Sequence, residues 1–324
     1  MTKRRIDVIV LVSAVALTSA CAASTRPSAA TAVIVPAAHP GLKAMRVNGT
    51  VLNYIDSVTS SANLAAPVVI FVHGSLGDYN GASPQLATFA AVRRTVSYSR
   101  RYHQPNAVAD DGHTYSAELH ADDLAAFIRG LGTGPVDLVG ESYGGLVALE
   151  TARHHPELVR ALVLAEPAAL GLLARTPAGD SLRRATMAGV IPLRQMLARG
   201  DSLLAMGAFV SGTGGPPNGL DGLPPATRAY FLTQMPEFRR EMMADSDSYE
   251  PLLSCEDLAP IRAPMLVLRS ERASPLFSRI VDELAACLPA ARVITIPRAG
   301  HTMYHENPAA FNAAVLAFLT GTGR

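Results

Sequence analysis

Six apolar runs of strand length, separated by longer amphipathic stretches, constrain the fold of this chain more than any other feature. The runs are VVIFV at 68–72, TVSYS at 95–99, VDLVG at 136–140, ALVLA at 161–165, MLVLR at 265–269 and RVITI at 292–296. The amphipathic stretches lie at 116–130, 143–155, 276–288 and 307–319. Unbroken apolar strands that alternate with helices are typical of a parallel sheet covered on both faces. We therefore predict an α/β protein with a mostly parallel central sheet flanked by helices.

Two segments depart from this alternation. Near the start, Asn48-Gly49 separates two strand-like runs within 45–57, which predicts a hairpin because both residues tolerate positive φ. Between the sixth and seventh strands the pattern is helical, and a Gly/Pro-rich stretch at 211–225 divides it. We therefore predict a helical cap at 168–258, inserted after the sixth strand, and a core formed by 43–167 and 259–324.

The N-terminus has the pattern of a targeting segment. Basic residues at 3–5 precede the apolar VIVLVSAVAL at 8–17, which is shorter than the roughly 20 residues of a membrane-spanning helix. The stretch LTSAC, which ends at Cys21, resembles the lipobox of bacterial lipoproteins, in which the cysteine is lipidated. Thr18 stands where that pattern more often has an aliphatic residue, so ordinary signal cleavage remains the alternative.

These features predict an exported protein of bacterial type, either periplasmic or anchored to the membrane through a lipidated Cys21. We expect the signal at 1–21 and a flexible tether at 22–42, which is rich in Ala, Ser, Thr and Pro. Cys255 and Cys287 remain beyond the signal. In an oxidising compartment they form a disulfide or stay as two buried thiols, and the sequence leaves both options open.

The composition describes a globular chain with no general attraction to polyanions. Of its 324 residues 49% are hydrophobic and 17% are charged, and the formal net charge is +1. We therefore expect no nucleic-acid partner. The stretches DDGH at 110–113 and HADD at 120–123 lack the spacing of a zinc site, and we expect surface residues there and no metal.

A serine lies where the third of the six runs gives way to a helical pattern. Residues 140–144, Gly-Glu-Ser-Tyr-Gly, fit G-x-S-x-G, with the strand-like run before them and helical spacing after them. This context is typical of a nucleophile elbow, in which a strained backbone raises the serine hydroxyl above the sheet. Ser142 is therefore the candidate nucleophile.

A serine hydroxyl needs a base that removes its proton during attack. His301 follows the last strand-like run, and the loop after such a strand opens on the same crevice as the elbow. His305 is the rival, but it lies closer to the final helix. We expect His154 and His155, at the end of the helix after Ser142, to be solvated or capping.

From about residue 43 to the end, the chain resembles the α/β-hydrolase family of serine hydrolases and esterases with a helical cap. The matching motifs are FVHGSLGD at 71–78, GESYGG at 140–145, LVLAEP at 162–167 and AGHTMYHENP at 299–308. The resemblance implies a Ser-acid-His triad and an oxyanion hole. It implies that the oxyanion is held by the backbone N–H of Tyr143 and by that of Ser75, with Leu76 as the second choice. It also favours turn packing over direct catalysis for His73.

The acid of the triad is where this sequence departs from the family pattern. The stretch LRSERASPL at 268–276 has no aspartate where the family usually places one. Glu166 follows the sixth strand, where some haloalkane dehalogenases that resemble this chain place their acid. Glu271 follows the seventh strand and is the alternative. Either glutamate preserves the family's chain order of serine, acid and histidine.

The resemblance implies a serine hydrolase that needs no cofactor, and the N-terminal segment predicts that it is exported. Because the cap pattern is apolar, we expect small to medium uncharged carboxylic esters as substrates. Leu203, Leu204, Met206, Phe209 and Val210 either line the substrate pocket or bury the cap's own face. We expect Arg100 and Arg101 to be solvated or structural. The alternatives are a cofactor-free perhydrolase of haloperoxidase type, a C–C bond hydrolase with the same triad, and a non-catalytic binding module.

Overall fold

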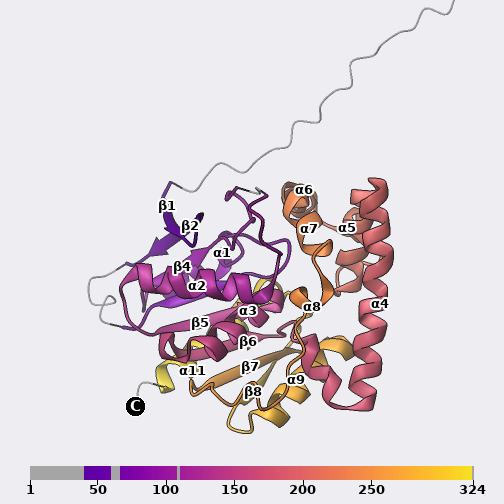
Figure 1. Ribbon diagram of the computed structural model, residues 1–324. Coiled ribbons are helices and arrows are strands. Elements are labelled where there is room, and N and C mark those ends of the chain that lie inside the picture. The colour runs from indigo at the N-terminus through magenta and orange to yellow at the C-terminus, as the bar shows by residue number, and fades with distance from the viewer. Residues whose placement is uncertain (1–39, 60–65, 108–109, 323–324) are drawn as a thin grey trace, which may run out of the picture. The chain divides into compact units, whose positions relative to one another are not determined.

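The computed structural model describes residues 40–59, 66–107 and 110–322, which are built around an eight-stranded sheet (Figure 1). The strands are β1 (Leu42–Val47), β2 (Thr50–Ser57), β3 (Val69–Val72), β4 (Thr95–Tyr98), β5 (Val136–Glu141), β6 (Val159–Ala165), β7 (Met265–Ser270) and β8 (Arg292–Ile296). Their order in the sheet is β1-β2-β4-β3-β5-β6-β7-β8. The pairs β1–β2 and β2–β4 are antiparallel, and every pair from β4 to β8 is parallel. The mostly parallel sheet predicted from the sequence is confirmed.

The hairpin between β1 and β2 forms at the predicted dipeptide. Asn48 has a φ of 41° and Gly49 a φ of 77°. Val47 pairs with Thr50 across the turn. Both central residues therefore occupy the left-handed region that a tight hairpin requires.

Helices cover both faces of the sheet because alternate strand residues face opposite ways. The helices of the sheet domain are α1 (Ser83–Ala90), α2 (Ala117–Leu131), α3 (Ser142–His154), η2 (Pro156–Leu158), α9 (Pro275–Cys287), α10 (Met303–Glu306) and α11 (Pro308–Gly321). On one face α2, α3 and α9 bury residues such as Phe127, Leu146 and Leu284. On the other face α1 and α11 bury Phe89 and Val315. Two separate apolar cores result, one on each side of the strands.

The segment between β6 and β7 forms the helical cap. Its helices are η3 (Leu170–Arg175), α4 (Pro177–Arg199), α5 (Ser202–Gly212), η4 (Gly219–Gly222), α6 (Pro225–Thr233), α7 (Met235–Met242) and α8 (Ser246–Tyr249). They gather on one side of the sheet (Figure 1). The cap has its own apolar core, in which Leu197, Met206 and Phe238 are fully buried.

A disulfide joins the end of the cap segment to the sheet domain. Cys255 and Cys287 are bonded, with their Cα atoms 4.8 Å apart. Cys287 is the last residue of α9, and Cys255 lies between α8 and β7. Of the two options that the sequence left open, the structure has the disulfide.

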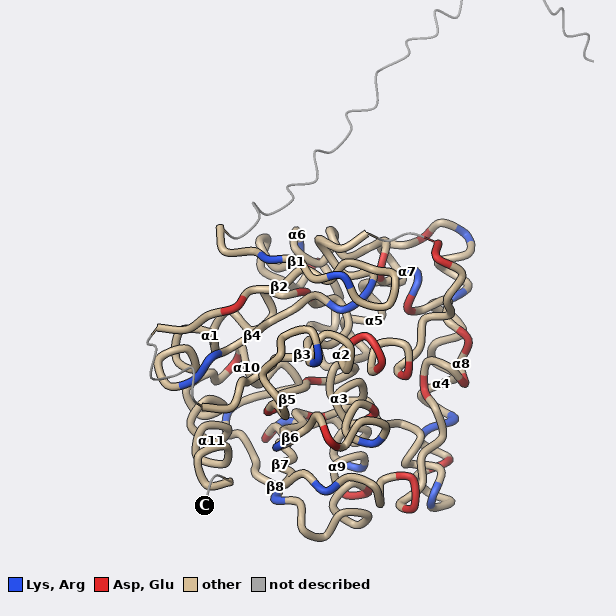
Figure 2. The backbone as a smooth tube through the Cα atoms, turned by 60° about the vertical axis from the view of Figure 1, so that its left-hand side comes forward, with Lys and Arg blue, Asp and Glu red and all other residues tan. Residues whose placement is uncertain are grey.

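Charged positions are distributed over the sheet domain and the cap, with basic and acidic residues intermixed (Figure 2). Among the described residues, no helix combines the length and the apolar character needed to cross a membrane. The predicted signal at 1–21 and the tether up to residue 39 lie outside the described part of the chain.

The parallel topology determines where a site can lie. Strands β3, β5, β6, β7 and β8 run in one direction, so their carboxyl ends lie along the same edge of the sheet. The turns that follow these strands therefore bring residues far apart in sequence close together.

Candidate active site

Ser142 lies in the sharp turn between β5 and α3. Its φ is 51°, in the left-handed region that a residue with a side chain rarely adopts. The turn is possible because its neighbours are glycines. A Cβ on Gly140 would lie 2.5 Å from the carbonyl oxygen of Gly144, and a Cβ on Gly144 would collide with the carbonyl oxygen of Val72. This is the geometry of a nucleophile elbow.

His301 follows β8 and meets a glutamate that follows β6. Its Nδ1 lies 2.8 Å from Oε2 of Glu166. Glu166 is fully buried, whereas the His301 side chain is 12% exposed. The His301 ring also stacks on Phe277 of α9, with ring centroids 3.9 Å apart. A carboxylate and an aromatic ring therefore hold the imidazole in place.

Ser270, at the end of β7, fixes the second oxygen of Glu166. Oε1 of Glu166 accepts hydrogen bonds from the Ser270 backbone N–H at 2.7 Å and from the Ser270 hydroxyl at 2.5 Å. Burial by itself raises the pKa of Glu166, but the hydrogen bonds from His301 and Ser270 outweigh it, and the pKa lies below its ordinary value. Glu166 is therefore ionised at neutral pH, with both oxygens bonded. It then accepts the Nδ1–H of His301, which leaves Nε2 as the basic nitrogen.

Glu271, the alternative acid, lies in the turn after β7 and binds a backbone group there. Its Oε2 accepts the N–H of Arg298. Its own N–H donates to the carbonyl of Ile296, at 3.0 Å. Of the two glutamates proposed from the sequence, the structure brings Glu166 to His301 and assigns Glu271 to a turn.

The other histidines considered from the sequence, His305, His154 and His155, form no hydrogen bond or ion pair with Glu166 in the described part of the chain. His305 lines the same cavity as His301, and burial lowers its pKa. His154 lies 3.3 Å from Glu150, and His155 lies 3.1 Å from Asp122. These last two belong to the far end of α3, away from Ser142.

The turn after β3, residues 73–77, lies beside the start of α3, and we call it the β3 turn. The Gly74 N–H donates to Oε1 of Glu141 at 2.7 Å. Arg100 donates from Nε to the His73 carbonyl and from Nη2 to the Gly74 carbonyl, both at 3.0 Å. Among the contacts of the described residues, none engages the backbone N–H of Ser75 or Leu76.

His73 and the two arginines after β4 are structural. The His73 ring accepts the backbone N–H of Arg100 at Nε2 and contacts the Gly74 carbonyl through Nδ1, so it links the β3 turn to the segment after β4. Arg101 binds both oxygens of Asp123, at 2.6 and 2.8 Å. Arg100 and Arg101 are only 1% and 2% exposed, so of the two options left open for them, solvated or structural, the structure has the second.

Ser142 and His301 line a cavity of about 820 Å³ between the sheet domain and the cap. Its lining is mainly apolar. The sheet domain contributes Ser75, Leu76, Glu141 and Tyr304 among others, and the cap contributes Phe209, Val210, Leu223, Pro224, Tyr230 and Phe231.

Three of the five apolar residues of α5 take one of the two roles considered for them, and the other two take neither. Phe209 and Val210 line the cavity. Met206 is fully buried inside the cap, and Leu203 and Leu204 are 55% and 60% exposed. One helix therefore supplies the cavity wall, the cap core and an outer surface.

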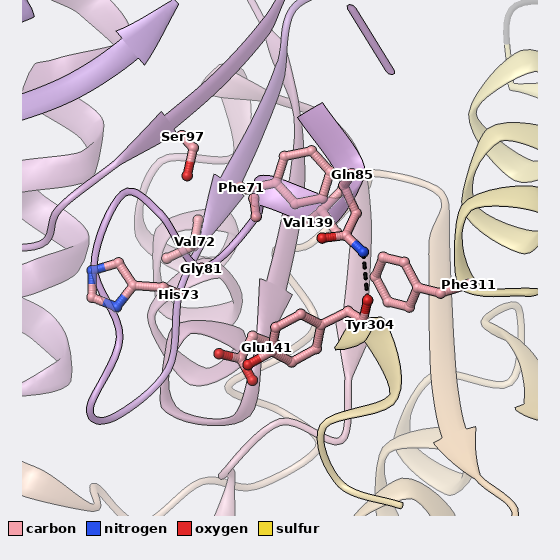
Figure 3. Close-up of a pocket in the computed structure, with 11 residues that line it drawn as sticks. Phe71, Val72, His73, Gly81, Gln85, Ser97, Val139, Glu141, Tyr304 and Phe311 are labelled. Atoms are coloured by element: carbon pink, nitrogen blue, oxygen red, sulfur yellow. Dashed lines mark hydrogen bonds between the residues drawn. The ribbon is translucent and has the colours of Figure 1, made fainter. Parts of the chain in front are cut away.

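A second, much smaller pocket of about 20 Å³ shares lining residues with the cavity (Figure 3). Glu141 and Tyr304 line both spaces, and their side chains lie next to each other in the close-up. Burial and the Glu141 carboxylate raise the pKa of Tyr304. Gln85 donates to the Tyr304 carbonyl at 2.6 Å. A space of this size accommodates about one water molecule, so it adds no room for substrate.

Among the described residues, no group of three or more His, Cys, Asp or Glu side chains is arranged to hold a metal ion. The expectation of surface residues in HADD is wrong for His120 and Asp123, which are buried. Asp123 is the partner of Arg101.

Three polar residues near the site carry no distinctive sequence signal. Ser270 supports Glu166 from the end of β7. Glu237 and Glu241 lie on α7 of the cap and are fully buried. A pair of glutamates one helical turn apart is typical of a solvated helix face, so the sequence pattern indicated the opposite of their burial.

Known proteins resemble this chain in sequence and in fold. The model of the alpha/beta hydrolase family matches residues 69–314. The chain is 30% identical over 112 residues to the uncharacterized hydrolase YraK of Bacillus subtilis (strain 168), covering 34% of this chain and 40% of YraK. It is 23% identical over 266 residues to the sn-1-specific diacylglycerol lipase ABHD11 of Mus musculus, covering 78% of this chain and 81% of that protein. The match to YraK therefore spans less than half of that protein's length.

The fold is similar to that of carboxylesterase CesB (YbfK) from Bacillus subtilis, with a TM-score of 0.69 and 17% identity over 86% of this chain and 91% of that one. The stretch matched by the family model contains the elbow at Ser142 and the turns that hold Glu166 and His301. With the parallel sheet, the inserted cap and this match in place, the chain belongs to the alpha/beta hydrolase family.

Proposed function

We propose that this protein is a serine hydrolase that cleaves carboxylic esters through an acyl-enzyme. The observation that carries the proposal is the 2.8 Å contact between His301 Nδ1 and the buried carboxylate of Glu166. The same imidazole lines one cavity with Ser142, whose backbone is strained in the manner of a nucleophile elbow. A hydroxyl, an imidazole and an ionised carboxylate in this order form a general-base triad.

In the first step, the hydroxyl oxygen of Ser142 attacks the ester carbonyl carbon, and Nε2 of His301 takes the hydroxyl proton. The C=O electron pair moves to oxygen, and the N–H groups of Tyr143 and Ser75 stabilise the resulting oxyanion. When the tetrahedral intermediate collapses, the C–O bond to the alcohol breaks, and His301 gives its proton to the departing oxygen. Glu166 stabilises the imidazolium throughout without taking its proton.

In the second step, water replaces the alcohol. His301 removes a proton from water, which attacks the acyl carbon attached to Ser142. Collapse of the second intermediate breaks the bond to Ser142, returns the proton to its oxygen and releases the carboxylic acid. The enzyme is regenerated and no cofactor takes part.

The cavity supports uncharged esters of small to medium size as substrates. Its volume of about 820 Å³ lies within the range of small-molecule sites, and the cap side is formed largely by apolar residues such as Phe209, Leu223 and Phe231. Apolar walls favour acyl chains over charged groups, whose desolvation would not be compensated. Similarity to a diacylglycerol lipase and to a carboxylesterase is consistent with ester substrates.

A chromogenic ester series, from acetate through butyrate and octanoate to laurate, tests the reaction and the substrate size together. We expect hydrolysis with an optimum inside the series, and covalent labelling by a fluorophosphonate probe. Ser142→Ala is the control and should lose both. Absence of labelling in correctly folded wild-type protein would contradict the proposal and favour a non-catalytic binding module, and a preference for anionic or peptide substrates would contradict the substrate class.

We also propose that the protein acts outside the cytoplasm. The disulfide between Cys255 and Cys287 is of the kind that persists in oxidising compartments, and the N-terminal sequence has the pattern of an export signal. Cell fractionation with mass determination of the mature N-terminus tests this. A lipidated Cys21 in the membrane fraction, or a cleaved chain in the periplasm, supports export, whereas an unprocessed cytoplasmic chain contradicts it.

A further inference from the structure

Two buried carboxyl groups of the cap face the sheet domain. Glu237 and Glu241 lie one turn apart on α7 and are 1% and 0% exposed. Helix α7 packs against α4 and α5, and Tyr249 of α8 stacks on Tyr143 of α3, so this part of the cap lies next to the elbow (Figure 1). We call Glu237 and Glu241 the α7 carboxyl pair.

Glu241 reaches the β3 turn directly. Its Oε1 accepts hydrogen bonds from the hydroxyl of Ser75 and from the hydroxyl of Tyr249, the latter at 2.7 Å. Glu237 binds a different set of residues: its Oε1 lies 3.2 Å from the Tyr115 hydroxyl and 3.0 Å from Nε2 of His103. The two carboxyls therefore connect the cap to separate parts of the sheet domain.

We infer that Glu241 is a positioning residue: by binding the Ser75 hydroxyl, it holds the Ser75 backbone N–H at the oxyanion, so the cap completes the oxyanion hole. This inference rests on the proposed function. It assigns the cap a part in the chemistry besides covering the cavity.

The other polar groups of the β3 turn are bound from the sheet side. Glu141 accepts the Gly74 N–H, and Arg100 donates to the carbonyls of His73 and Gly74. Among the hydrogen bonds of the described residues, the Ser75 hydroxyl is the polar group of this turn that bonds to the cap, and Leu76 packs in the cap core. The turn is thus clamped from two sides, and the Ser75 N–H remains for the substrate. An oxyanion donor is effective only when it is oriented before the reaction, because its reorganisation would otherwise add to the barrier.

The surroundings of Glu241 favour its neutral form. Burial, together with the Glu237 carboxylate, raises the pKa of Glu241 to about 8. The Oε2 atoms of both glutamates are buried, with no hydrogen-bond partner among the described side chains. A proton on Oε2 of Glu241 that forms a hydrogen bond to Oε2 of Glu237 would give both Oε2 atoms a partner. Oε1 of Glu241 then remains free to accept hydrogen bonds from Ser75 and Tyr249.

Burial raises the pKa of Glu237 as well, whereas the charge of Arg100 lowers it. With Glu237 ionised, the pair carries one negative charge, opposite the buried guanidinium of Arg100. The polar and titratable groups that face Glu241 come from every element around it: Glu237 on its own helix, Ser75 of the β3 turn, Arg100 and His103 after β4, Tyr115 before α2, Tyr143 of α3, Tyr249 of α8 and Glu250 after α8. Burial keeps the pKa of His103 well below its ordinary value, so Arg100 is the cation of this group. Loss of the Glu241 proton would place two adjacent carboxylates against one cation and push α7 away from the turn.

Replacement of Glu241 tests the inference through kcat. Glu241→Ala removes the support of Ser75 but leaves its N–H in the chain. We expect kcat for a chromogenic ester to fall about 10- to 100-fold, less than the 10²- to 10³-fold lost when an oxyanion donor is removed outright. KM should change by less than about threefold, because the donor acts mainly in the transition state. Glu241→Gln keeps an acceptor at Oε1 and a donor toward Glu237, and should recover most of the loss.

The pH profile separates positioning from simple structural support. In the wild type we expect kcat to fall as the pH rises above about 8, when Glu241 loses its proton. Glutamine cannot ionise, so Glu241→Gln should extend the plateau to higher pH. This comparison remains informative if Glu241→Ala does not fold.

Two further variants provide controls. Ser75→Ala removes the other half of the hydrogen bond, so its loss of kcat should not multiply with that of Glu241→Ala in the double variant. Met242→Ala, at the next residue of α7, removes packing inside the cap core. It should lower the melting temperature without moving the alkaline limb of the profile.

Three results would overturn the inference: wild-type kcat in folded Glu241→Ala, multiplying losses in the double variant, or the same alkaline limb in wild type and Glu241→Gln. These results differ from a failure of the proposed function. A wild type that is neither labelled nor active on esters would contradict the proposed reaction. A labelled, active wild type whose kcat and pH profile are shared by the Glu241 variants would contradict only the role of Glu241.

Discussion

The carboxylate of Glu166 differs from that of Glu271 in what surrounds it. Glu166 is fully buried and holds His301 on one oxygen and Ser270 on the other. Glu271 is exposed and accepts a backbone N–H within its own turn. Both follow a parallel strand, and the sequence ranks them only through resemblance. The difference in burial and bonding makes Glu166 the acid of the proposed mechanism and Glu271 a structural residue of its turn.

We predict that Glu166→Gln lowers kcat about 10³- to 10⁴-fold, because an amide does not hold the imidazole tautomer or stabilise the imidazolium. Glu271→Gln is the matched control, with the same chemical change at the neighbouring strand end, and should stay within about threefold of the wild type. Steady-state kinetics on one chromogenic ester measures both. A larger loss in Glu271→Gln than in Glu166→Gln would reverse the assignment of the acid.

Single residues also show which parts of the site could be predicted from the sequence and which could not. Ser142 and His301 can be found because a strained elbow and the turn after the last strand have recognisable surroundings. Arg100 cannot be placed in the same way. An arginine after a strand is solvated in most proteins, and here it is buried because the carbonyls of the β3 turn and the hydroxyl of Tyr115 accept its hydrogen bonds.

Among the elements, those with one clear apolar period agree best with prediction. Helices α2, α3, α9 and α11 begin and end within about two residues of the amphipathic stretches. Helices α2, α9 and α11 bury one face on the sheet, whereas α3 is buried on all sides from Tyr143 to Ala152. Helix α4 contributes less to the core. Over its 23 residues it buries only Gly179, Leu193 and Leu197.

The disulfide joins two elements that the chain alone leaves far apart. Cys255 and Cys287 are separated by 32 positions, and closing a loop of this length reduces the entropy of the unfolded chain. We predict that the double variant Cys255→Ser/Cys287→Ser loses about 3 to 4 kcal/mol of unfolding free energy. Urea unfolding of the two proteins measures the difference.

Neither cysteine lines the cavity, so the same double variant should keep its kcat at a temperature where it is folded. Reduced wild-type protein serves as the second form without the bond and should lose a similar amount of stability. An unchanged urea midpoint in both forms would show that the bond adds nothing to the fold.

At the scale of the molecule, the site follows from topology more than from any single motif. A parallel sheet brings the ends of β3, β5, β6, β7 and β8 to one edge, and that edge is predictable from the order of strands and helices. The contacts between the cap and the sheet domain cannot be predicted in this way, because they depend on how two separately packed units pack against each other. The α7 carboxyl pair and Ser75 are 162 or more positions apart, and no local pattern in the sequence connects them.

Burial of the α7 carboxyl pair has a consequence for the stability of the whole protein. An ordinary glutamate loses its proton near pH 4.5, whereas Glu241 in the folded protein keeps it to about pH 8. Between these values the folded protein binds more protons than the unfolded chain, so the free energy of unfolding falls as pH rises. Below the lower value both states hold the proton, and above the upper value neither does.

We predict that the wild type loses up to about 1.4 kcal/mol of unfolding free energy per pH unit relative to Glu241→Gln across this interval, because glutamine binds no proton in either state. Urea unfolding at several pH values measures the difference. The exposed Glu118 of α2 offers the matched control, and Glu118→Gln should follow the wild type at every pH. If wild type and Glu241→Gln change in parallel, the extra proton is absent from the folded protein.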